Sequence, residues 1–200
     1  MRGKILGRVM AAWGLLAAGT VVAQAPAQTA GNYQYVLLAT QKTSTMDKEI
    51  NQLAKEGYRF AGVMGGETAF GGNETLVIME RPLGTPARER YRYKLLATQK
   101  TSTMQKELKQ FGDAGYEYKG QTVFESAFGG QEVVCILERD LELKEVPVYE
   151  YKLLATKKTS TMQKELSEVA AQGFQFVGIT VAETAFGGKE VVTITRRAAK

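Results

Sequence analysis

The segment Tyr151-Lys152-Leu153-Leu154-Ala155-Thr156, followed by Thr159-Ser160-Thr161-Met162-Gln163-Lys164-Glu165-Leu166, decides the fold because the chain contains it three times. The same text stands at residues 93–108, and a slightly changed version stands at residues 35–50. The first tyrosines of the three copies are 58 residues apart, and so are Gly57, Gly115 and Gly173. A constant spacing over three copies indicates one supersecondary unit that is used three times.

Each unit predicts the order strand, helix, strand, strand. Residues 33–40 alternate between two faces and are rich in aromatic and aliphatic side chains, which is typical of a strand. Met46, Ile50 and Ala54 then recur at helical spacing, and Gly57 stands where the helix should end in a left-handed residue. Two further strands are expected at 58–65 and 74–81, joined by a Gly-Gly turn, and the other copies repeat the pattern.

We therefore expect an α+β protein with three tandem β-α-β-β repeats. A lone unit of about 50 residues is marginally stable, and one helix covers only one face of a three-stranded sheet. Because the second face is also apolar, we expect the three sheets to pack together or to close into a barrel-like body around a pseudo-threefold axis, with the helices outside. The alternative is three domains on linkers that bury the second face by oligomerisation. The expected segments are a signal peptide (1–25), a flexible lead-in (26–32), repeat 1 (33–82), a linker (83–90), repeat 2 (91–140), a linker (141–148), repeat 3 (149–197) and a tail (198–200).

The first 25 residues have the composition of a secretory signal peptide. Arg2, Lys4 and Arg8 precede an almost wholly apolar run at 9–23, and Ala23-Gln24-Ala25 fits a signal-peptidase site. The run is shorter than the ~20 residues that cross a bilayer, so we expect cleavage rather than a membrane anchor. No cysteine lies near the cleavage site, which argues against a lipid anchor. The sequence thus predicts a periplasmic or secreted bacterial protein.

Composition and charge exclude some classes of protein. With 44% hydrophobic and 24% charged residues, the chain is typical of a globular protein. The formal net charge of +5 falls to +2 when the three basic residues of the signal peptide are removed. This small charge is not the footprint of a nucleic-acid-binding protein, so we expect no nucleic-acid partner.

Two residue types limit the chemistry. Cys135 is the only cysteine, so no intrachain disulfide can form, and we expect it to be a small core or half-buried residue. A reactive or intermolecular thiol is the alternative. The chain has no histidine, which removes the commonest general base and a major metal ligand. We expect no cofactor and no metal.

The repeat also resembles a known family. Its marks are Tyr-x-Tyr-Lys in the first strand, a short helix containing Glu-Leu, Gly115-Tyr116-Glu117 or Gly173-Phe174-Gln175 at the helix end, and Gly-Gly before a strand that ends in Arg. In these motifs the chain resembles a bacterial domain-of-unknown-function family of small β-α-β-β proteins, usually found as one copy with Gly-Trp-Glu at the helix end. Tyr or Phe replaces that Trp here, and the triplication and signal peptide are departures. The resemblance implies the fold and no chemistry.

Two segments that agree in all copies are the candidate contact surface. Lys-Thr-Ser-Thr stands before the helix, Ala-Phe-Gly-Gly forms the hairpin turn, and the course of the chain predicts that both lie at one end of the unit. A lysine and hydroxyls at a helix start favour a phosphate, a carboxylate or a sulfated glycan, and the phenylalanine suits a protein partner. The structural alternative is that the serine caps the helix while the phenylalanine shields the loop. The candidate residues are Lys42, Thr43, Ser44, Thr45, Phe70, Lys100, Thr101, Ser102, Thr103, Phe128, Lys158, Thr159, Ser160, Thr161 and Phe186.

Catalysis is the third hypothesis. Glutamates flank each hairpin and could work as paired carboxylates, although acidic residues at strand ends are more often solvated or paired with lysine. No nucleophile–base set accompanies them. We therefore expect no enzyme but a binding or scaffolding module for an unknown protein partner, with oligomerisation possible, and an anion or glycan binder as the alternative. The glutamates are Glu67, Glu74, Glu125, Glu132, Glu183 and Glu190.

Overall fold

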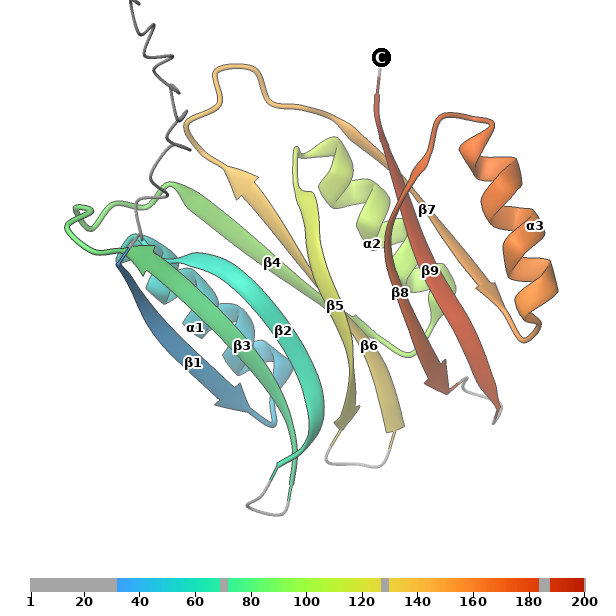
Figure 1. Ribbon diagram of the computed structural model, residues 1–200, viewed down its shortest axis with the longest axis horizontal. Coiled ribbons are helices and arrows are strands. Elements are labelled where there is room, and N and C mark those ends of the chain that lie inside the picture. Colours follow the sequence, from blue (N-terminus) through green and yellow to red (C-terminus); the bar gives the residue numbers. More distant parts are fainter. Residues whose placement is uncertain (1–31, 69–71, 127–129, 184–187, 200) are drawn as a thin grey trace, which may run out of the picture. The chain divides into compact units, whose positions relative to one another are not determined.

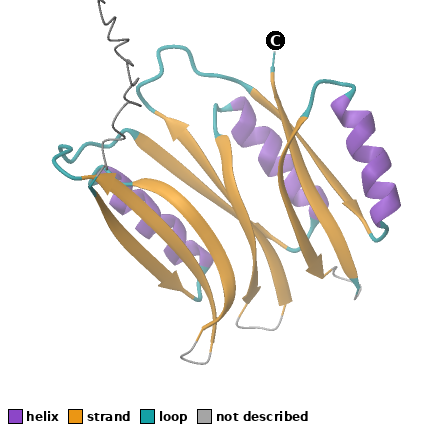
Figure 2. Cartoon of the chain, viewed as in Figure 1, coloured by secondary structure: helices purple, strands orange, loops and turns teal. Residues whose placement is uncertain are grey.

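The computed structural model describes residues 32–68, 72–126, 130–183 and 188–199, and this part of the chain contains three helices and nine strands (Figures 1 and 2). The fold is α+β with three repeated units, as the sequence predicts. The elements are β1 (Tyr33–Thr40), α1 (Thr43–Lys55), β2 (Arg59–Thr68) and β3 (Gly72–Pro82) in repeat 1; β4 (Tyr91–Thr98), α2 (Thr101–Asp113), β5 (Glu117–Ser126) and β6 (Gly130–Asp140) in repeat 2; β7 (Tyr149–Thr156), α3 (Thr159–Ala170), β8 (Gln175–Glu183) and β9 (Lys189–Ala198) in repeat 3.

Each repeat forms its own antiparallel sheet with the third strand in the centre. The strand orders are β1-β3-β2, β4-β6-β5 and β7-β9-β8. In repeat 1, Tyr35 lies opposite Glu80 and Leu37 lies opposite Ile78. The equivalent residues of the other repeats pair in the same register, so the three sheets present equivalent side chains on equivalent faces.

The helix ends confirm one prediction. Gly57, Gly115 and Gly173 have φ values of 88°, 82° and 84°, which is the left-handed region that glycine enters without a steric cost. In repeat 1 the N–H of Tyr58 closes the end by donating to the Leu53 carbonyl at 3.0 Å.

The predicted serine caps are wrong. The helices begin at the first threonine of each Lys-Thr-Ser-Thr segment, and the preceding lysine holds the N-cap position in an extended conformation without a side-chain capping bond. The hydroxyl that orders this turn belongs instead to the last residue of the preceding strand. In repeat 1 the Lys42 N–H donates to Thr40 Oγ1 at 3.1 Å, and Thr98 and Thr156 accept in the same way.

The predicted closed body with its helices outside is also wrong. Helix α1 packs between its own sheet and the back face of the next sheet: the same core contains Met46 and Ile50 of α1, Val77 of β3, and Leu95 and Ile136 of repeat 2. Helix α2 lies in the same way between the sheets of repeats 2 and 3. Within residues 32–199, one core joins repeat 1 to repeat 2 and the other joins repeat 2 to repeat 3, and α3 belongs to the last unit (Figure 1). The apolar back face is covered by the helix of the preceding repeat rather than by a matching sheet face.

Cys135 is a core residue, as the preferred hypothesis holds. It lies on β6, its side chain is fully buried in the core that also contains residues of α2, and burial raises the pKa of its thiol well above the ordinary value. Among the described residues no helix combines the length and apolarity that crossing a membrane requires.

Candidate functional site

The joint between repeats 1 and 2 is made by side chains of α1 on the free edge of β4. The N–H of Tyr93 donates to Asn51 Oδ1 at 2.9 Å, and Asn51 Nδ2 donates to the Tyr93 carbonyl at 3.1 Å. Asp47 Oδ1 accepts from the N–H of Leu95 at 2.9 Å. Exposed backbone groups of an edge strand are a template for pairing with another chain, and α1 removes that possibility at β4.

A side chain of helix α2 bonds to the edge of β7 in the same way. Gln105 Nε2 donates to the Tyr151 carbonyl at 2.9 Å, and Gln105 Oε1 accepts from the N–H of Leu153 at 2.7 Å. Gln105 is the 58-residue equivalent of Asp47, so one helix position makes the edge contact at both joints. The small residues Ala54 and Gly112 let each helix approach the next repeat closely, and a Cβ at Gly112 would overlap the Tyr149 carbonyl oxygen.

A buried tyrosine hydroxyl ties each joint together. Tyr93 Oη accepts from the N–H of Phe60 at 2.8 Å and donates to Glu138 Oε2 at 2.7 Å. Tyr151 Oη accepts from the N–H of Tyr118 at 2.7 Å and donates to the carbonyl of Tyr116 at 2.9 Å. Burial raises the pKa of both hydroxyls, so they stay protonated and can donate at neutral pH.

A chain of five charged residues crosses both joints. Arg59 of repeat 1 bonds Glu138 at 2.9 Å, and Lys119 bridges Glu138 at 3.2 Å and Glu117 at 2.9 Å. Glu117 then bonds Arg196 of repeat 3 at 2.7 Å. The charges exchange sides between the joints: at the first, the earlier repeat supplies the arginine, and at the second it supplies the glutamate. This exchange favours the native order of repeats, because pairing repeat 1 directly with repeat 3 would bring Arg59 and Arg196 together.

Three groups of this network, Arg59, Glu117 and Arg196, have shifted pKa values. Hydrogen bonding to Glu138 raises the pKa of Arg59, an effect that partial burial only reduces. Burial alone would raise the pKa of Glu117, but hydrogen bonds from Lys119 and Arg196, together with their charges, outweigh it and lower the pKa. The network therefore favours the ionised forms of Arg59 and Glu117 and joins the repeats.

The outer ends of repeats 1 and 3 have no such cover within the described chain. Tyr35 is 61% exposed, whereas its equivalents Tyr93 and Tyr151 are 3% and 5% exposed. Leu37 and Ile78 beside it are 62% and 43% exposed. We call the surface formed by Tyr35, Leu37, Ile78 and Gly62 the head face; in repeats 2 and 3 the same positions receive the preceding repeat.

Repeat 3 carries the complementary surface. Phe176 and Ile179 of β8 are 57% and 54% exposed, and Gln163 and Ala170 of α3 are also exposed. Leu166 is half-buried, whereas its equivalents in α1 and α2 are fully buried. We call these five residues the tail face. Among the described helix and strand residues, the exposed large apolar side chains all belong to repeats 1 and 3.

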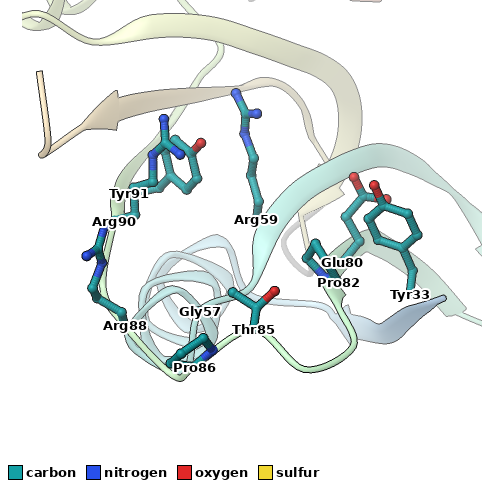
Figure 3. A pocket seen from close by; sticks show the side chains of 10 residues that line it. All are labelled: Tyr33, Gly57, Arg59, Glu80, Pro82, Thr85, Pro86, Arg88, Arg90 and Tyr91. Atoms are coloured by element: carbon teal, nitrogen blue, oxygen red, sulfur yellow. The ribbon is translucent and has the colours of Figure 1, made fainter. Parts of the chain in front are cut away.

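A cavity of about 550 Å³ lies at the linker end of the first joint (Figure 3). Three arginines line it together with two tyrosines, two prolines and Glu80. All three arginines already hold acidic partners: Arg59 bonds Glu138, Arg90 bonds Asp140 at 2.9 Å, and Arg88 bonds Glu142. A bound anion would have to displace these carboxylates, so the cavity is a structural feature of the joint rather than our candidate site.

The described residues place the candidate helix-start segments beside the hairpins. Thr40 lies opposite Thr75, and Thr68 lies opposite Gly72, so each helix-start loop and the base of its hairpin share one end of the sheet. Lys42, Lys100 and Lys158 are exposed there, and so are the serines of the three segments. These segments belong to different repeats and form three separate surfaces. Phe70, Phe128 and Phe186 lie outside the described residues, and so do the side chains of Glu67, Glu125 and Glu183.

Sequence reasoning missed the head and tail faces, although a signal for them exists. The residues Tyr, Leu and Ile of the head face are identical in all three copies, so the first copy carries an interface without a preceding repeat. The exchanged charges are also present in the sequence. Positions 59, 117 and 175 hold Arg, Glu and Gln, and positions 80, 138 and 196 hold Glu, Glu and Arg. Their meaning depends on the strand order, which the sequence leaves open.

Comparisons with known proteins return no match to a family model, to a curated protein or to a solved structure. The resemblance to the domain-of-unknown-function family therefore stays a hypothesis.

Proposed function

We propose that this chain is an exported, non-catalytic binding or scaffolding module whose contact surface is the head face. The observation that carries the proposal is the contrast between Tyr35, which is 61% exposed, and Tyr93 and Tyr151, which are buried within the chain. Repeat proteins normally end in a repeat whose outer face is polar. Here repeat 1 keeps at its outer face the residue types that repeats 2 and 3 use for contact.

The energy of such a contact would come from apolar burial. Full burial of a leucine or isoleucine side chain contributes about 1.5–3 kcal/mol, and the binding energy of protein complexes concentrates in a few residues, among which tyrosine is enriched. The free edge of β1 adds main-chain groups equivalent to those that α1 and α2 bind on β4 and β7.

Site-directed photo-cross-linking tests this function. A photo-reactive phenylalanine analogue at Leu37 should give a cross-linked adduct of discrete mass in cells that export the protein. The same analogue at Lys48, an exposed position of α1, is the control and should give none. The absence of an adduct at Leu37 would contradict the proposed function.

The hairpin-end contacts remain a second part of the proposal, in the form of anion or glycan binding. The observation in their favour is that Lys42, Lys100 and Lys158 are exposed at helix starts without a side-chain cap. Titration with phosphate and with a sulfated glycan, followed by NMR, should show binding that is lost when the three lysines become alanine. The matched control replaces the exposed helix lysines Lys48, Lys106 and Lys164, which are also 58 residues apart.

Export rests on the signal-like first 25 residues. If the signal peptide is cleaved, the mature chain begins at Pro26 or within a few residues of it. Intact-mass measurement of protein from a periplasmic extract checks this expectation. Recovery of the full-length chain in the membrane fraction would contradict it.

A further inference from the structure

We propose that the partner of the head face is the tail face of a second copy of this chain, so that the protein assembles head to tail. This inference rests on the proposed function and adds the identity of the partner. The chain itself contains an interface of this kind twice, once between repeats 1 and 2 and once between repeats 2 and 3. A third instance of the same interface would join repeat 3 of one copy to repeat 1 of the next.

The helix side of the interface is present on α3. Gln163 is equivalent to Gln105, which bonds the Tyr151 carbonyl and the Leu153 N–H. It is exposed, and within the described residues it makes no hydrogen bond that would compete. On the next copy, the Tyr35 carbonyl and the Leu37 N–H lie in the same register on the free edge of β1. Gln163 therefore has the length and the amide to make the contact that Gln105 makes.

The strand side of the interface is also present. Phe60 and Val63 of β2 lie over Gly120 of β5, where an added Cβ would be 3.3 Å from Phe60 Cζ and 3.1 Å from Val63 Cγ1. Tyr118 and Gln121 lie over Gly178 in the same way at the second joint. The equivalents on the tail face are Phe176 and Ile179, which are exposed. The equivalent glycine on the head face is Gly62, where an added Cβ would meet no atom of the described residues within 4 Å.

The charges on the two faces are compatible with this joint, and changing them provides a way to test it. Arg59 faces Glu138 at the first joint, and Glu117 faces Arg196 at the second. The corresponding pair between copies is Gln175 and Glu80, which brings no like charges together. A glutamine can donate to the carboxylate but carries no charge, so this joint is weaker than the two within the chain. It also lacks the high effective concentration of a covalent connection, so association depends on protein concentration.

The head and tail faces differ, so the contact is heterologous and produces either a ring of fixed size or an open ladder of oligomers. The test uses sedimentation velocity of the purified chain over a wide concentration range. The wild type should associate as its concentration rises.

Leu37→Arg blocks the head face and Ile179→Arg blocks the tail face, and each variant alone should be a monomer. Because one variant keeps its tail and the other its head, their mixture should give a one-to-one dimer and nothing larger. Leu143→Arg, at an exposed apolar residue of the second linker, is the matched control and should associate like the wild type.

Charge substitutions at Gln175 give a second measurement of association, which nonspecific contact between apolar surfaces would not change. Gln175→Arg copies the arginine–glutamate pair of the first joint and should strengthen association at least about threefold. Gln175→Glu faces Glu80 with a like charge and should weaken it by a similar factor.

Three results would overturn the proposal. The first is a wild-type chain that stays monomeric at every concentration. If the photo-reactive analogue at Leu37 still cross-links to a different protein in cells, the proposed binding function would hold without self-association. A tail variant that still dimerises would show a head-to-head contact. A monomer whose β1 amides are protected from hydrogen exchange would place the chain's own N-terminal segment on the head face.

Discussion

At the residue scale, one buried position of the third strand holds three different side chains. Val77, Cys135 and Thr193 are equivalent, and each is 0% exposed. Valine fills the place without a polar atom, cysteine behaves as a small hydrophobe, and the threonine hydroxyl is buried without a hydrogen-bond partner among the described residues. A buried hydroxyl without a partner costs stability, so repeat 3 has the least favourable residue of the three.

Thr193→Val should therefore stabilise the protein by about 1 kcal/mol, because it removes an unsatisfied hydroxyl at nearly constant volume. Cys135→Ser should have the opposite sign and cost about 1–3 kcal/mol, since it introduces such a hydroxyl. Urea denaturation followed by circular dichroism measures both. The oligomeric state should not change in either variant, and a wild-type dimer band that disappears on reduction would contradict the buried, inert thiol.

Glu117 gives a pH-dependent prediction. Its pKa is lowered in the folded state by Lys119 and Arg196, against the opposing effect of burial. A carboxyl with a lowered pKa contributes stability above its unfolded pKa, which is about 4.3 for glutamate, and loses it as the pH falls through the folded value. Urea midpoints of the wild type should therefore fall between about pH 5 and pH 3 more steeply than those of Glu117→Gln. The effect should shrink in high salt because about a third of the Glu117 side chain is exposed, and parallel curves for the two proteins would refute the role of this carboxyl.

At the element scale, the helices act on two sheets at once. The sequence predicts each helix, its apolar stripe and its terminal glycine, because these depend on residues close in the chain. It also predicts that the back face of each sheet needs cover. It does not show what covers that face, since the partners of Tyr93 and Leu95 lie 42 and 48 residues away and depend on the strand order. Ser44 fails as a cap for a different reason: Thr40, at the end of the preceding strand, already orders the turn.

The close approach of α2 to repeat 3 can be tested at Gly112. Alanine is better than glycine in a helix by about 1 kcal/mol, but a Cβ here would overlap the backbone oxygen of Tyr149. Gly112→Ala should therefore destabilise the protein by about 1–3 kcal/mol, as overpacking does. Gly62→Ala is the control and should be close to neutral, because a Cβ there would meet no atom within 4 Å in the part of the chain that the structure describes. A stabilised Gly112→Ala variant would mean that the helix is free to move away from repeat 3.

At the scale of the whole molecule, the repeats depend on each other as neighbours do in a solenoid. The contacts join repeat 1 to repeat 2 and repeat 2 to repeat 3, and each of the two cores draws its residues from both partners. Repeat 2 contributes its back face to one core and its helix face to the other. The charged chain from Arg59 to Arg196 passes through it as well.

The three repeats should therefore unfold together, and the middle one should be the least able to fold alone. Excised residues 91–140 would expose Tyr93, Leu95 and Ile136 on one side and lose the sheet against which Leu108 packs on the other. A unit of about 50 residues has little stability to spare for such a loss, so the fragment should aggregate or melt without cooperativity. The whole chain should show one transition by circular dichroism and by tyrosine fluorescence.

Deletion of repeat 3 alone removes one joint and should leave a smaller protein that still folds, because the core between repeats 1 and 2 stays complete. A monomeric middle fragment with a sharp melt would show instead that the repeats are independent domains that touch without depending on each other.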